Sequence, residues 1–124
     1  MSLVGPALPD STLTPGAVRA LDAAQVCARP LPPRPSREEW ARLRAEVARR
    51  YGMSRAPRGW ELDHEIPRCL GGADVVENLW LEPPDEAARK DRIEVEECRR
   101  ACAIGTDAAV ESAQFWFAEG MWSK

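Results

Sequence analysis

The chain has 124 residues, of which 44% are hydrophobic and 30% are charged, and its formal net charge at pH 7 is −3. This length supports one small hydrophobic core and excludes two independent cores. No apolar run approaches the roughly 20 residues of a membrane-spanning helix, and the N-terminal residues lack the basic and apolar stretches of a signal peptide. We therefore expect a small globular domain with neither segment.

The charge is distributed unevenly along the chain. Residues 29–58 contain nine arginines against three glutamates, a balance of +6, whereas residues 59–124 contain fifteen acidic against seven basic residues, a balance of −8. One explanation is a solvated helix face beside an acidic half. The other is a basic patch that faces phosphates, next to a site that carries carboxylates.

Four cysteines are present, at positions Cys27, Cys69, Cys98 and Cys102. An even number in a small domain allows two disulfides, with three pairings to choose from. A structural zinc module through Cys98 and Cys102 is an alternative, although the chain has no C-x-x-C motif and a single histidine. Four buried free thiols are the third interpretation. Paired cysteines would favour an exported or periplasmic protein, and unpaired ones a cytoplasmic protein.

The first half of the chain predicts an arm followed by a helix. Residues 1–35 are rich in proline and are expected to form an extended N-terminal arm, with a short turn of helix near 15–20. Residues 36–124 are expected to form a single domain. Its first helix begins with the capping-box pattern of Ser36 and Glu39, continues as an apolar stripe at three- and four-residue steps, and ends before a glycine.

The second half predicts two short strands and two helices, which makes the fold class α+β. Residues 60–66 alternate between polar and apolar types and predict a strand, which a Gly-Gly turn separates from a second strand at 78–81. A helix is expected from Asp85 to about Ala103. After a glycine stop and a threonine cap, a last helix is expected over 107–119.

The single histidine, His64, directly follows Asp63 on the first predicted strand. A lone histidine is more often a structural residue than a catalytic one. Successive side chains of a strand point to opposite faces, however, so Asp63 could hold a divalent cation while His64 activates a water molecule. Metal-assisted hydrolysis of a phosphodiester requires this division of labour.

Four short segments carry a resemblance to a known family. They are LDHEIP at 62–67, LGG at 70–72, NLW at 78–80 and KDRIE at 90–94. Together they resemble the HNH endonuclease motif, the ββα-metal finger. More narrowly, the chain is similar to a group of small bacterial HNH-like proteins, whose other motifs are matched by LTPG at 13–16, VC at 26–27, Cys102 and AQ at 113–114. The resemblance implies a ββα-metal core with an N-terminal arm and flanking helices.

The resemblance also implies roles for individual residues. Asp63 would be a metal ligand, His64 the general base, and Asn78 the residue that ties the loop between the strands and orients the histidine. The family's helical ligand is replaced by Ala87, which cannot bind a cation. Asp91 lies one helical turn later and matches a second ligand position of some HNH nucleases.

Further expectations concern the substrate contacts and the remaining carboxylates of the site. Lys90 would contact a phosphate, or extend past the helix surface to solvent; Asp91 could equally face solvent. Glu94 would be a more distant ligand or a structural carboxylate. Arginines of the first helix would contact the nucleic-acid backbone; they are Arg42, Arg49 and Arg50.

The cysteine positions of the resembling group match Cys27 and Cys102. The resemblance therefore implies a Cys27–Cys102 disulfide, which leaves Cys69–Cys98 as the second pair. Two such bonds would attach the arm and the Gly-Gly turn to the long helix.

The expected function is divalent-metal-dependent hydrolysis of DNA, with RNA as an alternative substrate, little sequence preference and no membrane partner. Mg²⁺ or Mn²⁺ is the expected metal, with Zn²⁺ or Ni²⁺ as alternatives. The rival hypothesis is a catalytically impaired HNH scaffold that binds nucleic acid or protein. Ala87 and the acidic C-terminal half favour this rival, whereas the intact Asp63–His64 pair opposes it.

Overall fold

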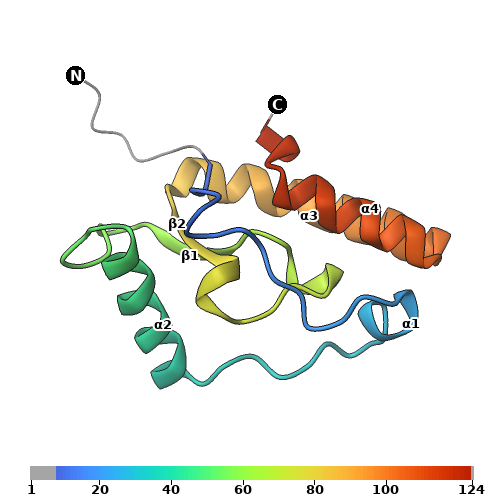
Figure 1. Ribbon diagram of the computed structural model, residues 1–124, viewed down its shortest axis with the longest axis horizontal. Helices are drawn as coiled ribbons and strands as arrows, with labels where there is room; N and C mark the ends of the chain where they lie inside the picture. Colours follow the sequence, from blue (N-terminus) through green and yellow to red (C-terminus); the bar gives the residue numbers. More distant parts are fainter. Residues whose placement is uncertain (1–7, 124) are drawn as a thin grey trace.

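The computed structural model describes residues 8–123 and contains six regular elements joined by turns and loops. They are α1 (Ala23–Val26), α2 (Arg37–Arg50), β1 (Glu61–His64), β2 (Leu79–Glu82), α3 (Pro84–Ile104) and α4 (Asp107–Ala118), with 3-10 turns η1 (Arg68–Leu70), η2 (Val76–Asn78) and η3 (Met121–Ser123). The strands form a two-stranded hairpin between α2 on one side and the paired helices α3 and α4 on the other (Figure 1). The predicted α+β class is confirmed.

The register of the hairpin decides which residues face which layer. Asp63 pairs with Trp80 and His64 pairs with Leu79 in the antiparallel ladder. Residues directly opposite each other share a face of the sheet. Trp80 packs in a core cluster with side chains of α3 and α4, and Leu79 packs in a second cluster with side chains of α2. The consecutive residues Asp63 and His64 therefore face different layers.

Local signals placed the helix ends correctly. The Ser36 hydroxyl accepts from the Glu39 amide and the Glu39 carboxylate accepts from the Ser36 amide, so the predicted capping box is formed. Gly105 ends α3 with a φ of 74°, a conformation that a side chain would disfavour. The Thr106 hydroxyl accepts from the Ala109 amide and caps α4 as predicted.

The arm corrects one prediction. Residues 15–20 were expected to contain a turn of helix, but Val18 instead forms an isolated bridge with Gly72. The backbone of this stretch bonds to the turn after β1: the Arg19 amide donates to the Gly71 carbonyl and the Ala73 amide donates to the Ala17 carbonyl. These backbone groups are thereby used in long-range pairing and cannot close a helical turn. The short helix forms later, as α1.

The loop between the strands is closed by Asn78. Its side-chain oxygen accepts from the Ile66 amide at 3.0 Å, and its amide group donates to the carbonyls of Ile66 and Ala73. β1 therefore ends at His64, two residues earlier than expected, because the Asn78 side chain bonds to the Ile66 backbone groups that a longer ladder would use. A Cβ at Gly72 would collide with the Ile66 carbonyl, so this turn requires glycine.

Both expected disulfides are formed. Cys27 bonds to Cys102 and Cys69 bonds to Cys98, with Cα separations of 5.7 and 5.9 Å. The alternatives of a zinc module and of free thiols are wrong, because all four sulfur atoms are used. The first bond attaches the end of α1 to α3, and the second attaches η1 to α3. Two disulfides are consistent with an oxidising, exported setting.

Among the described residues, none of the helices combines the length and the apolar character that crossing a membrane requires.

Glu65 is a buried carboxyl group that does not belong to the predicted Asp63–His64 site. Glu65 is the first residue after β1 and is 2% exposed, and its Oε1 has no hydrogen-bond partner. Burial raises the pKa of Glu65 to about 8; the positive charge of Lys90 opposes this shift and the negative charge of Glu119 adds to it. The folded protein therefore holds this proton at pH values where the unfolded chain, with its ordinary pKa of 4.5, has lost it.

Because the folded state binds the additional proton, Glu65 lowers the stability as the pH rises from about 4.5 to about 8. The side chain of the Glu65→Gln variant cannot ionise. In this variant the slope of the free energy of unfolding against pH should therefore be smaller by up to about 1.4 kcal/mol per pH unit. Urea unfolding of both proteins across that range measures it. The exposed Glu77→Gln change is the control and should keep the wild-type slope; an equal slope for Glu65→Gln would contradict the assignment.

Candidate metal and acid–base site

An open pocket of about 380 Å³ lies where the arm, α2, β1 and α3 meet. Both residues of the predicted pair, Asp63 and His64, line it, together with Trp40 from α2 and Asp91 and Glu94 from α3. Neighbouring residues of a strand point to opposite faces. The carboxylate of Asp63 and the imidazole of His64 therefore reach the same pocket from different faces of the hairpin.

Three carboxylates converge at one side of this pocket. Asp63, Asp91 and Glu94 each offer an oxygen, and these oxygens lie within 4.8 Å of one another. Asp91 and Glu94 are three residues apart on α3 and therefore share a helix face that is turned toward β1. This group could hold a metal ion, and oxygen ligands suit Mg²⁺ or Mn²⁺. The two residues expected as ligands are brought together, and Glu94 joins them.

Lys90 lies beneath the carboxylates, with no exposed side-chain surface. Its Nζ donates to Asp63 Oδ2 at 2.8 Å, to Glu94 Oε2 at 2.5 Å and to the His64 carbonyl at 2.6 Å. Burial opposes the charge of this group, but the two carboxylates outweigh it and raise the pKa of Lys90. All three donors are used, so Nζ has none left for a substrate phosphate. The structure thus places Lys90 as an internal counter-charge, neither reaching substrate nor extending to solvent.

Two carboxyl groups near Lys90 have raised pKa values. Glu82 on β2 is fully buried with neither oxygen hydrogen-bonded; burial raises its pKa to about 9, and the charge of Asp63 adds to the shift. Burial also raises the pKa of Glu94 to about 7, although Lys90 opposes this. Sequence reasoning missed Glu82. Its alternation with Trp80 along β2 was the available signal, since it places both side chains on the core face of the strand.

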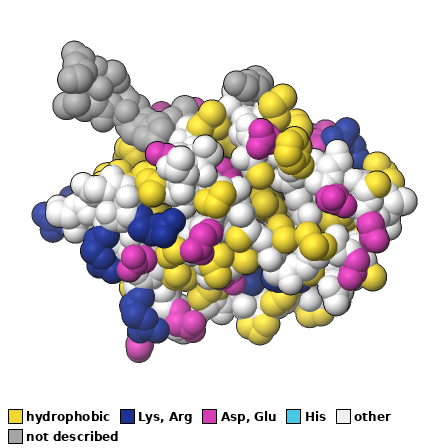
Figure 2. Space-filling model, viewed as in Figure 1, with side chains coloured by type: hydrophobic (Ala, Val, Ile, Leu, Met, Phe, Trp, Pro, Cys, Tyr) yellow, Lys and Arg dark blue, Asp and Glu magenta, His cyan; other side chains and the backbone are white. Residues whose placement is uncertain are grey.

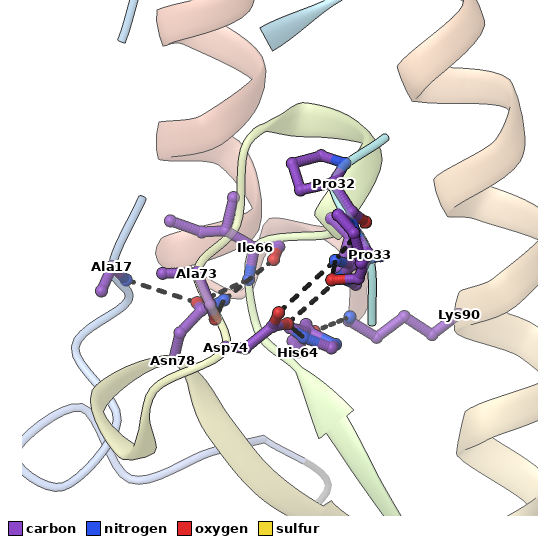
Figure 3. A network of polar contacts seen from close by, with 10 residues as sticks. Ala17, Pro32, Pro33, His64, Ile66, Ala73, Asp74, Asn78 and Lys90 are labelled. Atoms are coloured by element: carbon purple, nitrogen blue, oxygen red, sulfur yellow. Dashed lines mark hydrogen bonds and ion pairs between the residues drawn. The ribbon is translucent and has the colours of Figure 1, made fainter. Parts of the chain in front are cut away.

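His64 is held by contacts on two sides, of which Figure 3 shows the one with Asp74. Its Nε2 lies 2.7 Å from Asp74 Oδ1, and its ring stacks on Trp40 with the ring centroids 5.6 Å apart and the planes inclined by 24°. Burial lowers the pKa of His64, while the hydrogen bond and the charge of Asp74 oppose this shift. The lowered pKa favours the neutral form of the ring, which can accept a proton.

Asp74 is held in place by Arg68 as well as by His64. Burial alone would raise the pKa of Asp74, but hydrogen bonds from His64 and Arg68 lower it overall. Arg68 donates from Nε to Asp74 Oδ1 at 3.1 Å and from Nη2 to the carbonyls of Pro32 and Pro33 in the arm. Sequence reasoning missed both Asp74 and Arg68. The position of Asp74 just after the Gly-Gly turn was the only sequence signal for it.

Asn78 does not hydrogen-bond to His64. It ties the loop between the strands, as expected, and its side-chain amide donates to the Ala73 carbonyl at 3.1 Å. Since Ala73 precedes Asp74, this bond fixes the backbone from which Asp74 approaches the ring. Ala87, at the position of the missing helical ligand, is buried in the core.

The arginines expected to bind nucleic acid lie outside the pocket. Arg42 is exposed, Arg49 pairs with Glu46 at 2.7 Å, and Arg50 donates to the Leu13 carbonyl at 2.6 Å. Basic side chains gather over α2 and the loop that follows it, at the lower left of Figure 2. Among the residues that line the pocket, the arginines are Arg34 and Arg68. Arg34 is exposed and has the more accessible guanidinium.

Comparison with protein-family models, with curated proteins and with solved structures finds no match to this chain.

Proposed function

We propose that the chain is an HNH-type, divalent-metal-dependent endonuclease in which β1, β2 and α3 form a ββα-metal core. Its substrate is DNA, cleaved with little sequence preference, and RNA is the alternative. The preferred metal is Mg²⁺ or Mn²⁺, since the candidate ligands are all carboxylate oxygens. The paired cysteines favour an exported or periplasmic location for such an enzyme.

The observation that carries the proposal is the arrangement of Asp63 and His64 at one pocket. Asp63 belongs to a group of three carboxylates whose oxygens lie within 4.8 Å of one another. Burial lowers the pKa of His64, and its ring is held by Asp74 at 2.7 Å. A cation-binding group and a proton acceptor are thus adjacent yet separately supported, as metal-assisted hydrolysis requires.

A metal ion held by Asp63, Asp91 and Glu94 would stabilise the negative charge that develops on the phosphate and on the leaving oxygen. His64 takes a proton from the attacking water, whose oxygen forms a bond to phosphorus while the bond to the leaving oxygen breaks. The leaving oxygen is protonated by solvent. Arg34 and the arginines over α2 hold the phosphate backbone through charge, without reading sequence.

Nicking of supercoiled plasmid DNA tests this proposal. Wild-type protein should cleave with Mg²⁺ or Mn²⁺ and stop when a chelator is added. His64→Ala should lower the cleavage rate by about 10²-fold or more, the usual contribution of a general base. Asp91→Ala should weaken the metal dependence, whereas Asp85→Ala, which removes an exposed aspartate of the same helix, should not.

Cleavage that survives His64→Ala unchanged would contradict the mechanism. Thermal unfolding measures metal binding independently of DNA cleavage, since a metal that binds the folded state raises the melting temperature. Mg²⁺ or Mn²⁺ should therefore raise it for the wild type and for Asp85→Ala, and less for Asp91→Ala.

The second candidate is a non-catalytic scaffold that binds nucleic acid or protein. Lys90 favours it, because its ammonium group already engages one oxygen each of Asp63 and Glu94 and competes with a metal ion for their charge. The buried Ala87 favours it too. Salt-sensitive DNA binding without cleavage, and without a metal-dependent rise in melting temperature, would select this candidate.

A further inference from the structure

The hydrogen bond between His64 and Asp74 restricts which ring nitrogen can act as a base. An ionised carboxylate only accepts hydrogen bonds, so the 2.7 Å contact requires the proton to be on Nε2. In a neutral imidazole the other nitrogen, Nδ1, then carries the free lone pair. Asp74 also accepts from Arg68, through Nε at 3.1 Å and through Nη2 at 3.4 Å, which keeps it an acceptor.

The free nitrogen is the one that remains available at the pocket. Among the described residues, Nδ1 of His64 has no hydrogen-bond partner. This atom is nevertheless not one of the fully buried polar atoms without a partner. It therefore keeps contact with solvent, in a side chain that is 10% exposed and that lines the pocket. Stacking on Trp40 covers one face of the ring and leaves its edge to serve as the acceptor.

The Asp74 carboxylate makes more contacts than a carboxylate in an isolated surface ion pair. The Arg68 side chain is 10% exposed, and its Nη2 donates to the Pro32 carbonyl at 2.9 Å and to the Pro33 carbonyl at 3.1 Å. On the other side, Asn78 holds the Ala73 carbonyl. Asp74 is thus fixed through both its side-chain oxygens and its neighbouring peptide, and Figure 3 shows its carboxylate beside the His64 ring.

We infer that Asp74 is a positioning residue: it fixes the His64 ring in the tautomer with the proton on Nε2, so that Nδ1 is the atom that takes the proton from water. The second half of this inference rests on the proposed nuclease function, and the first half does not. Arg68 and the proline segment of the arm act through Asp74. The arm, far from the site in sequence, thereby contributes to the orientation of the base.

Nitrogen-15 NMR of the imidazole tests the tautomer directly, because His64 is the only histidine and its two ring nitrogens give unambiguous signals. Spectra recorded at mildly alkaline pH, where the ring is neutral, should show the wild type predominantly with the proton on Nε2. In Asp74→Asn the amide can either accept from Nε2 or donate to it, so the spectrum should shift toward a mixture of tautomers. Glu77→Gln, on the same loop, should keep the wild-type spectrum.

A wild-type ring that carries its proton on Nδ1 would overturn the inference even if every variant failed to fold. An unchanged tautomer in a folded Asp74→Asn would overturn it as well, because Asp74 would then serve only as a partner for Arg68. In the plasmid assay, Asp74→Asn should lower kcat by about 10²-fold with little change in KM. If the tautomer shifts but no protein cleaves DNA, the positioning role holds and the nuclease function fails.

Discussion

Replacing Cys27 and Cys102 together by alanine is expected to lower the free energy of unfolding by about 4.5 kcal/mol. The bond joins residues that are 75 positions apart, so it removes much of the conformational freedom of the unfolded chain. Small domains have total stabilities of about 5–15 kcal/mol, so this loss is a large part of the whole. Urea unfolding of the double variant and the wild type, both without reductant, measures the difference.

The second disulfide provides the matched comparison. Cys69 and Cys98 are 29 positions apart, so their replacement by alanine should cost about 3.5 kcal/mol, less than the first pair. A larger loss from the shorter loop would contradict the entropic explanation. It would indicate that the bond between η1 and α3 mainly maintains native packing around the pocket.

Replacing Lys90 by methionine is expected to cost about 3–5 kcal/mol of stability, because the variant leaves buried carboxylates without their counter-charge. The ammonium group is within 2.8 Å of Asp63 Oδ2 and 2.5 Å of Glu94 Oε2. Arg92→Met is the control: it also removes a cation from α3, but this side chain is exposed, and the change should stay within about 0.5 kcal/mol.

The Lys90→Met variant also tests the metal group. With Asp63 and Glu94 released from the ammonium, Mg²⁺ or Mn²⁺ should stabilise the variant more than it stabilises the wild type. Thermal unfolding with increasing metal concentration measures this difference. A variant that is as stable as the wild type without metal would show that Lys90 is not the main counter-charge. An equal metal response in both proteins would show that it does not compete for these ligands.

Local signals account for the elements that could be predicted. The periodic apolar stripe and the capping box of Ser36 and Glu39 placed α2, and the residues around Gly105 placed the boundary between α3 and α4. Each of these features depends on residues within about one turn of one another, which is why sequence spacing is sufficient. The turn of helix expected near residues 15–20 was wrong because the backbone there pairs with a loop more than fifty positions away.

Only part of the candidate site could be predicted in the same way. The adjacency of Asp63 and His64 is written in the sequence, and the alternation of a strand sends their side chains to opposite faces. The resemblance to HNH proteins supplied Asp91 and the disulfide pairing, which residue spacing left open. For Asp74 the only signal was its position just after the Gly-Gly turn, and a carboxylate in a loop is ordinary until the loop is folded against a particular ring.

By itself, the sequence determined the order of helices and strands, the capped helix ends, and the neighbouring positions of an acid and a base. The tertiary structure alone decided that Lys90 is a buried counter-charge and that Asp74 holds His64. It also decided that the arginines of α2 lie outside the pocket. These outcomes depend on the hairpin register and on how α2, α3 and the arm pack around it. Such contacts join residues distant in the chain, and local periodicity carries no information about them.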